Sequence, residues 1–283
     1  MPITNISDTA RWVAVYRAME SARPDALFRD PYAEGLAGER GRAIVREMKG
    51  GTRAAWAMIV RTAVLDELIL DRVRNGGVDT VINLAAGLDT RPWRLPLPAT
   101  LQWFDVDLPE MIEYKTTFMR GTPTVCRYEA VVADLTDAAV RVDVLRRLGG
   151  VARTALVVTE GLLIYLAEEQ VRALARSLHD AGSIRWWVSD VSNPMLLAWM
   201  NKQWGSVVDK GRAPFRFAPA DSAAFFASVG WRELQFRSGL SEARRLKREM
   251  RMMWFWRLLS RFTPRAKRIE TRRMVGYVLL ERA

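Results

Sequence analysis

The chain has 283 residues, 49% of them hydrophobic, so it can bury one full core, as one large domain or as two small ones. Its only cysteine, Cys126, excludes an internal disulfide, and the N-terminus lacks the basic and apolar regions of a secretory signal, so we expect a cytoplasmic protein. The net charge of +11 is uneven: residues 237–283 hold fourteen Lys and Arg against four Glu, a balance of +10. Such asymmetry is typical of an interacting surface.

The first part of the chain, residues 7–75, reads as helical. Apolar residues recur at helical spacing over 62–72, and Asn75 with the two following glycines ends the segment. We expect these helices to cap a sheet formed by the rest of the chain.

Seven apolar, β-rich runs follow, with helical patterns between several of them. This alternation predicts an α/β fold with a doubly wound, seven-stranded sheet that binds ligands at the carboxyl ends of its strands. The last two runs are about forty residues apart, far beyond common connection lengths, so an insert separates them. We expect one domain with a helical cap at 1–75, a core at 76–237, a basic helical insert at 238–274 and a last strand at 275–283. The runs lie near 79–84, 101–106, 127–133, 155–159, 185–191, 231–236 and 276–281.

The turn after the first run predicts a cofactor site. Small residues lead to Gly87, and about twenty residues later Asp107 ends the second run, as ribose-binding folds require. The turn is not G-x-G-x-x-G, and Asp89 would meet a phosphate with a carboxylate, which argues against NAD. S-adenosylmethionine carries an ammonium, a sulfonium and a ribose but no phosphate, so these residues favour methyl transfer. Asp89 has a second interpretation, as an N-cap or as the partner of Arg91.

Several motifs in this order resemble the leucine carboxyl methyltransferase family, including its bacterial branch linked to polyketide and other secondary metabolism. The final fifty residues match less clearly. The resemblance implies a class I, Rossmann-like methyltransferase with S-adenosylmethionine as cofactor and an antiparallel pair as the last two strands. The motifs are SDTARW at 7–12, DPYA at 30–33, NLAAGLDTR at 83–91, FDVDLP at 104–109, ADL at 133–135 and EGLLIYL at 160–166.

The resemblance also implies roles for the residues that end the first three runs. Gly87 would contact the cofactor and Asp107 would bind the ribose, with Asp105 as the fallback if the strand ends earlier. Asp134 would bind the adenine amino group and Leu135 would cover the ring. Gly87 could instead be an ordinary turn glycine, and Asp134 an ordinary loop residue before the next helix.

Two charged residues interrupt apolar stretches. Glu160 must find a cation or shift its pKa, and the resemblance supplies the ammonium of the cofactor. Arg61 would reach the carboxylates of cofactor or substrate, unless it is a solvated helix residue. The resemblance places Tyr165 in the substrate pocket, whereas the alternative is a core tyrosine. The early lysine of the family's eukaryotic members is missing, and Arg11 is its candidate substitute.

The only histidine, His179, falls at the polar end of a helix and is interpreted as a C-terminal cap residue. Without a histidine base, the economical acceptor is a carboxylate, which is already ionised at pH 7. We therefore expect an O-methyltransferase that forms a methyl ester on a small, anionic molecule, with Arg61 and Tyr165 at the reaction centre and no metal ion. The alternatives are a phenol O-methyltransferase with Tyr165 or Asp190 as base, and a non-catalytic regulator that binds the cofactor and acts through a basic membrane- or partner-binding helix.

Residues 252–259 are apolar nearly all round and flanked by basic residues. They predict a lid helix over the substrate pocket. Alternatively, the segment 244–261 docks on an anionic membrane or an acidic carrier protein; we do not expect nucleic acid as a partner. The flanking residues are Arg244, Arg245, Lys247, Arg248, Arg251, Arg257 and Arg261.

Overall fold

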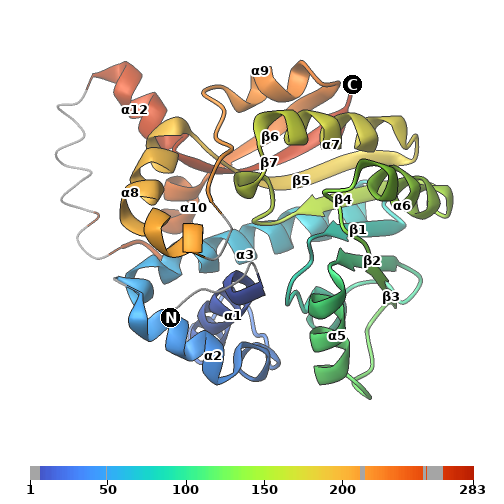
Figure 1. Ribbon diagram of the computed structural model, residues 1–283, viewed down its shortest axis with the longest axis horizontal. Coiled ribbons are helices and arrows are strands. Elements are labelled where there is room, and N and C mark those ends of the chain that lie inside the picture. Colours follow the sequence, from blue (N-terminus) through green and yellow to red (C-terminus); the bar gives the residue numbers. More distant parts are fainter. Residues whose placement is uncertain (1–6, 49, 211–213, 251–252, 254–263) are drawn as a thin grey trace.

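The computed structural model describes residues 7–48, 50–210, 214–250, 253 and 264–283. Its centre is a seven-stranded sheet with the strand order β3-β2-β1-β4-β5-β7-β6 (Figure 1). Strands β1 to β5 pair in parallel, and β7 is antiparallel to both β5 and β6. The predicted doubly wound sheet is confirmed, including the antiparallel pair at its end. The strands are β1 Thr80–Leu84, β2 Gln102–Asp107, β3 Arg127–Val132, β4 Ala155–Thr159, β5 Ile184–Ser192, β6 Trp231–Ser238 and β7 Val275–Arg282.

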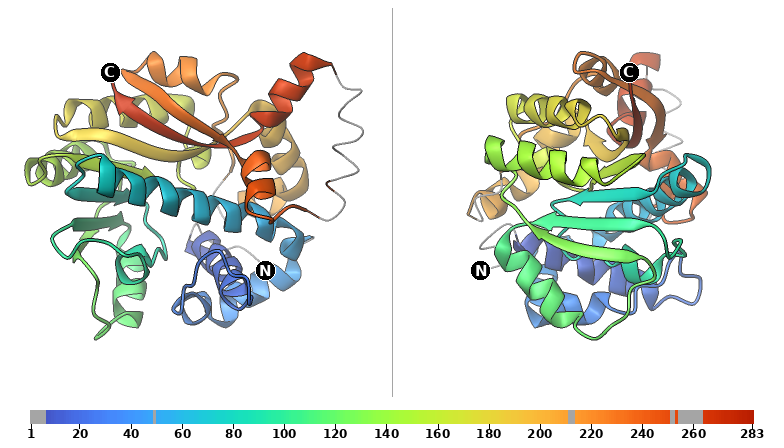
Figure 2. Two further views of the ribbon diagram at one scale, coloured as in Figure 1. Left: turned by 180° about the vertical axis from the view of Figure 1, so that it is seen from behind. Right: turned by 90° about the vertical axis from the view of Figure 1, so that its right-hand side faces the viewer.

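Helices cover both faces of this sheet (Figure 2). Because side chains alternate along a strand, Ile82 of β1 faces one layer and Val81 the other. One core packs the strands against α6, α7 and α9, and the other packs them against α3 and α10. The helices are α1 Ser7–Ser21, α2 Ala33–Glu47, α3 Gly51–Asn75, α4 Arg91–Arg94, α5 Pro109–Phe118, α6 Ala138–Gly150, the short 3-10 helix η1 Leu163–Tyr165, α7 Glu168–Asp180, α8 Pro194–Lys210, α9 Ser222–Ala227, α10 Gly239–Arg245 and α12 Arg265–Arg272.

The N-terminal helices pack in two different ways. The third helix, α3, packs directly on the sheet, and Val64, Leu65 and Leu68 contribute to its core. Helices α1 and α2 pack against each other instead (Figure 1). In α1, the side chain of Arg17 donates to the carbonyl of Leu88 at 2.5 Å. This contact places α1 over the turn that follows β1.

The basic insert departs from the sequence-based interpretation at one residue. Arg248 is not a surface charge, because its guanidinium is buried and pairs with Glu20 at 2.7 Å and Asp25 at 3.2 Å. Arg245 pairs with Glu67 and Glu242. The apolar centre of the predicted lid or docking helix, 252–259, lies outside the described residues except for Met253. None of the helices in the described ranges is long and apolar enough to span a bilayer.

Candidate functional site

One cavity of about 1220 Å³ opens at the carboxyl ends of the parallel strands. The residues that follow β1, β2, β3 and β4 all line it, and Asp190 of β5 joins them. This edge includes the point where the chain changes direction between β1 and β4, which is where open α/β sheets bind ligands. The predicted cofactor residues Arg61, Gly87, Asp89, Asp107, Asp134, Leu135 and Glu160, together with Tyr165, all line this cavity.

Gly87 and Asp107 form a direct contact across the two strand ends. Gly87 has φ = 51°, which favours glycine, and a Cβ atom there would also lie 3.2 Å from the Cβ of Ala10 in α1, a tight contact. The Gly87 N–H donates to Asp107 Oδ2 at 2.6 Å, and the Leu108 N–H donates to Oδ1 at 2.8 Å. Burial raises the pKa of Asp107, although these two hydrogen bonds oppose the shift.

Asp105 is not an alternative ribose ligand. It is fully buried within β2 and does not line the cavity. Its carboxylate accepts from Lys115 Nζ at 2.6 Å, from Trp103 Nε1 at 2.9 Å and from Asn83 Nδ2 at 3.0 Å. These three donors already satisfy it, so the fallback assignment is wrong and Asp105 is a structural residue.

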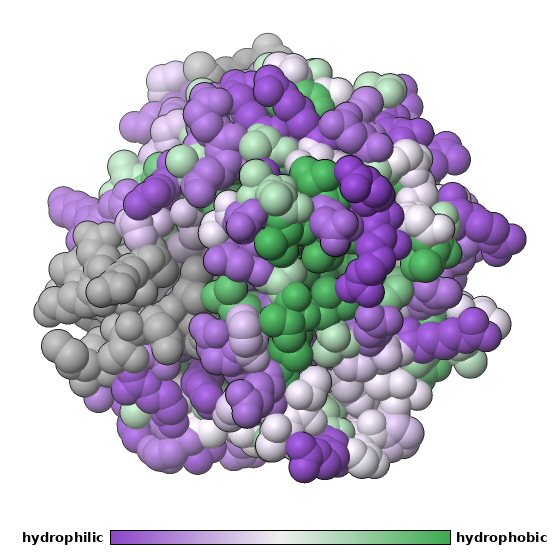
Figure 3. Space-filling model, turned by 45° about the vertical axis from the view of Figure 1, so that its right-hand side comes forward, coloured by the Kyte–Doolittle hydropathy of each residue, from purple (hydrophilic) through white to green (hydrophobic). Residues whose placement is uncertain are grey.

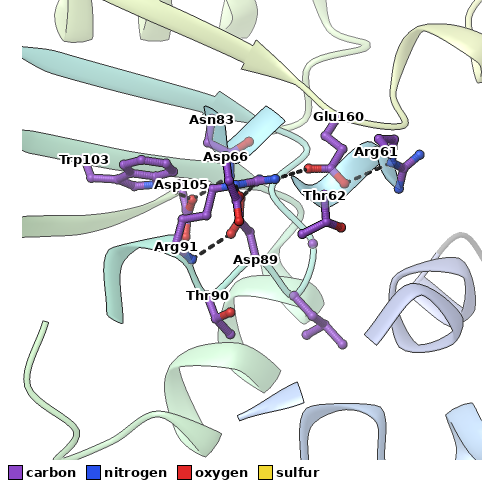
Figure 4. A network of polar contacts seen from close by, with 12 residues as sticks. Arg61, Thr62, Asp66, Asn83, Asp89, Thr90, Arg91, Trp103, Asp105 and Glu160 are labelled. Atoms are coloured by element: carbon purple, nitrogen blue, oxygen red, sulfur yellow. Dashed lines mark hydrogen bonds and ion pairs between the residues drawn. The ribbon is translucent and has the colours of Figure 1, made fainter. Parts of the chain in front are cut away.

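An ion-pair network forms the wall between the β1 turn and the end of β4 (Figure 4). Arg91 gives one guanidinium nitrogen to each of three carboxylates: Asp66 at 2.6 Å, Asp89 at 2.6 Å and Glu160 at 2.8 Å. Its side chain is only 2% exposed. The predicted pairing of Asp89 with Arg91 is therefore present, and Asp89 also accepts from Arg91 N and Asn83 Nδ2.

Arg61 extends this network toward β5. Its Nε donates to Glu160 at 2.9 Å and its Nη1 lies 3.3 Å from Asp190. Glu160 was expected to need the ammonium of a cofactor, but the structure already provides Arg61 and Arg91 as its cations. Arg61 is buried and is not a solvated helix residue.

The arginines of this network lower the pKa values of its carboxylates. Burial alone would raise the pKa of Glu160, but the charges of Arg91 and Arg61 outweigh it and hold that pKa below its usual value. For Asp89, burial is likewise outweighed by the charges of Arg91, Lys115 and Arg94, and the pKa is strongly lowered. Both carboxylates are consequently ionised at neutral pH.

Asp134 and Leu135 lie side by side in the cavity wall after β3. Asp134 is exposed, and its Oδ1 accepts from the Thr136 N–H at 2.9 Å and from the Thr136 hydroxyl at 2.7 Å. These bonds lower the pKa of Asp134. Asp134 is thus a loop residue that shapes the next turn and also lines the cavity. A structural role in the loop is therefore compatible with the predicted adenine contact.

Tyr165 ends the short helix η1 and faces the cavity next to Phe215, with the ring centroids 5.5 Å apart. Burial raises its pKa, which the charge of Arg61 and a hydrogen bond with Thr9 only partly offset. The phenol therefore stays protonated at neutral pH and can donate a hydrogen bond, but it is poorly suited to act as a base.

The comparisons with known proteins identify the family to which the chain belongs. The sequence model of the leucine carboxyl methyltransferase family matches residues 10–179. The chain belongs to this family. A Streptomyces coelicolor relative, named "putative S-adenosyl-L-methionine-dependent methyltransferase", is 36% identical over 180 residues, which cover 59% of this chain and 62% of the relative. A Mycolicibacterium paratuberculosis relative with the same description is 37% identical over 188 residues, covering 60% of this chain and 67% of the relative. The chain thus matches about three fifths of the length of the Streptomyces protein.

Two solved structures share the fold of this family member over nearly its whole length. A DUF574 protein from Streptomyces avermitilis has a TM-score of 0.62 at 12% identity, with 97% of both chains covered. A structure described as a "putative methyltransferase" from Thermobifida fusca has a TM-score of 0.60 at 14% identity, with 100% of this chain and 96% of that chain covered. At this identity the likeness concerns the fold.

Arg11, the candidate substitute for the early lysine of the eukaryotic members, does not line the main cavity. The guanidinium of Arg11 stacks on the ring of Tyr114 at 3.8 Å and lines a smaller, neighbouring cavity. Arg17, on the same helix, lines the main cavity and pairs with Asp30 at 2.8 Å. The partner of Arg17 was visible in the sequence, because Asp30 is the first residue of the DPYA motif. The ion pair itself was not predictable, because the two residues are 13 positions apart and meet only through the turn between α1 and α2.

The other residues that the sequence did not identify belong to the far wall of the cavity. Helix α8 contributes Leu196, Trp199 and Met200, and the segment after it contributes Phe215 and Arg216. No local motif distinguishes them from core residues. His179 does not line the cavity; it lies in the last turn of α7, with its ring edge-on to Trp231.

Proposed function

We propose that this protein is an S-adenosylmethionine-dependent O-methyltransferase that forms a methyl ester on a small-molecule carboxylate. The observation that carries the proposal is the cavity itself, which gathers the four strand-end segments of the family motifs next to an apolar chamber. Its volume of about 1220 Å³ exceeds the roughly 300–1,000 Å³ of common ligand pockets, so cofactor and acceptor fit together. In line with the bacterial branch of the family, we place the reaction in the cytoplasm and in secondary metabolism.

The residues present suit this cofactor. Asp107 offers its carboxylate to the ribose, and Asp134 and Leu135 offer a polar and an apolar contact to the adenine. The turn at Gly87 carries Asp89 rather than a run of glycines, which suits a ligand without phosphates. The ion-pair wall of Arg61, Arg91 and Glu160 would face the amino-acid end of the cofactor, whose sulfonium supplies an electrophilic methyl group.

The chain's own residues favour an acceptor that arrives ionised. Tyr165 keeps its proton because burial raises its pKa. Asp190 accepts from the Gly161 N–H through Oδ1 and pairs with Arg61 through Oδ2, so its carboxylate already holds the β4 turn and the arginine in place. His179 lies outside the cavity. A carboxylate needs no base, whereas a phenol does, and the remaining task of the cavity is to align acceptor and methyl group in line.

The test is transfer of a labelled methyl group from S-adenosylmethionine to a library of carboxylic acids and a matched library of phenols. We expect label in the acids, released as methanol by mild alkali because the product is an ester. Alkali-stable label would identify the phenol O-methyltransferase instead. Binding of S-adenosylhomocysteine in calorimetry without any transfer would favour a non-catalytic binder.

A further inference from the structure

The part of the cavity away from the strand ends is strongly apolar. Its wall, here called the acceptor chamber, consists of Trp56, Met58, Tyr165, Trp199, Met200 and Phe215. Large apolar side chains continue to its rim, where Trp199 is 48% and Met250 is 42% exposed. On the face drawn in Figure 3, hydrophobic residues gather near the centre and are bordered by hydrophilic ones. An exposed apolar surface with a hydrophilic border is typical of a ligand-binding groove or another interaction site.

Five arginines of the described chain line the cavity, and four of them already have carboxylate partners. Arg17 pairs with Asp30, Arg61 with Glu160 and Asp190, Arg91 with three carboxylates, and Arg94 with Asp66. The fifth is Arg216, whose side chain has no hydrogen-bond or ion-pair partner among the residues that the structure describes. It is thus the one lining guanidinium, within those ranges, whose charge the protein leaves uncompensated.

The backbone holds Arg216 in a fixed place beside Tyr165. The N–H groups of Arg216 and Phe217 both donate to the carbonyl of Ile164 in η1, at 2.7 and 3.2 Å. Phe215 and Phe217 are buried on either side, while Arg216 is exposed. The two phenylalanines anchor the segment, and Arg216 between them lines the cavity.

We propose that Arg216 binds the anionic group of the acceptor, and that the rest of the acceptor is a predominantly apolar body seated in the acceptor chamber. The inference rests on the proposed function and adds the acceptor class and the residue that selects it. A guanidinium presents two parallel N–H groups to a carboxylate, which gives both affinity and orientation. Methylation removes the negative charge of the carboxylate. The ester product therefore loses this ion pair and leaves more readily than the acid.

The test is equilibrium binding to the protein saturated with S-adenosylhomocysteine. The probes are decanoate and 2-naphthoate, each compared by calorimetry with its own methyl ester. Wild-type protein should bind at least one acid about tenfold more tightly than its ester, within the range for a charge-assisted hydrogen bond. Arg216→Gln should lose this preference, and Arg216→Lys should retain part of it. The preference of the wild type should shrink with added salt, because Arg216 is exposed.

Arg120→Gln is the matched control, because it removes the same charge from an exposed arginine that does not line the cavity. It should behave as the wild type, and all variants should bind S-adenosylhomocysteine equally. The inference is wrong if neither acid is preferred over its ester, or if Arg216→Gln keeps the preference. The binding assay requires no turnover, so an Arg216-dependent anion site could stand even if no acid is methylated. Equally, transfer to acids that is indifferent to Arg216 would leave the proposed function intact and remove this inference.

Discussion

Asp107 lines the cavity and is also hydrogen-bonded to the protein backbone. Its two oxygens each accept one backbone N–H, from Gly87 and Leu108, which leaves a further lone pair on each oxygen for a ribose hydroxyl. Asp107→Ala should therefore weaken S-adenosylhomocysteine binding by about 1.5–3 kcal/mol, the range for a hydrogen bond to a charged group. Calorimetry at neutral pH measures this directly.

The matched control for Asp107 is Glu113→Ala, which removes an exposed carboxylate from α5 outside the cavity. Its affinity for S-adenosylhomocysteine should equal that of the wild type, and NAD should bind to neither protein. An Asp107→Ala protein with unchanged affinity would rule out the ribose assignment.

Glu160 has a larger structural effect than an ordinary ion-pair residue. It lies between Arg61 and Arg91, both buried, so neutralising it leaves two guanidinium groups short of a partner. Glu160→Gln should lower the free energy of unfolding by about 3 kcal/mol, as expected when one member of a buried ion pair is removed. Denaturant unfolding checks this against Glu168→Gln, which breaks the exposed pair with Arg172 and should cost less than about 1 kcal/mol. Equal losses in the two variants would show that the network adds no stability beyond a surface pair.

The residues of this network illustrate what the sequence could reveal locally. Gly87 and Asp107 were predictable because a strand, a small turn and an acid at the end of the next strand form one short pattern. The pairing of Arg91 with Asp89 is equally local. Its pairing with Asp66 and Glu160 was not predictable, since those partners lie 25 and 69 positions away and meet it only through the packing of α3 and β4.

At the scale of elements, Arg248 ties the C-terminal insert to the end of α1. It is 8% exposed and pairs with Glu20 of α1, which is fully buried. Arg248→Gln should destabilise the protein by about 3 kcal/mol, because it removes the closest cation of the buried Glu20 carboxylate and leaves it only the more distant Arg23 at 3.7 Å and the Leu27 N–H. It should also weaken S-adenosylhomocysteine binding, since α1 forms part of the cavity wall. Thermal unfolding and calorimetry measure the two effects.

Arg244→Gln is the control for Arg248, because Arg244 belongs to the same basic segment but is exposed. Its unfolding free energy should stay within about 0.5 kcal/mol of the wild type. If both variants behave alike, Arg248 is a surface charge and the tether does not exist.

The elements themselves were largely readable from the sequence, because periodicity distinguishes strands from helices. All seven strands lie where the apolar runs were, and the helical segment at 7–75 forms α1, α2 and α3. The sequence could not separate α3 from the two helices before it. All three show helical spacing, and only the packed structure places α3 on the sheet and α1 over Gly87.

At the scale of the whole molecule, sequence motifs predicted the strand-end side of the cavity but not the acceptor chamber. The strand-end residues occur in short, ordered patterns. The acceptor chamber is assembled from α3, η1, α8 and Phe215, which are far apart in the chain. Its tryptophan, methionine, tyrosine and phenylalanine side chains have the composition of a core, so no sequence pattern indicates that they surround an open space.

The whole cavity leads to a prediction about pH. If the acceptor is a carboxylate, kcat at saturating cofactor should be constant from about pH 6 to 9, because model carboxyl groups titrate near pH 4.

The protein's own groups should not change this profile. Glu160 and Asp89 have lowered pKa values in the folded protein. The stability that they contribute is therefore fully present above their pKa in the unfolded chain, and it is lost only as pH falls through the lower folded values. Burial raises the pKa of Tyr165, so its phenol does not ionise in this window either. Burial also raises the pKa of Asp107, and its proposed role is in cofactor binding, which saturation removes from the measurement. Single-turnover rates across the range provide the check. A tenfold rise per pH unit would show instead that the acceptor must lose a proton before it reacts, as a phenol does.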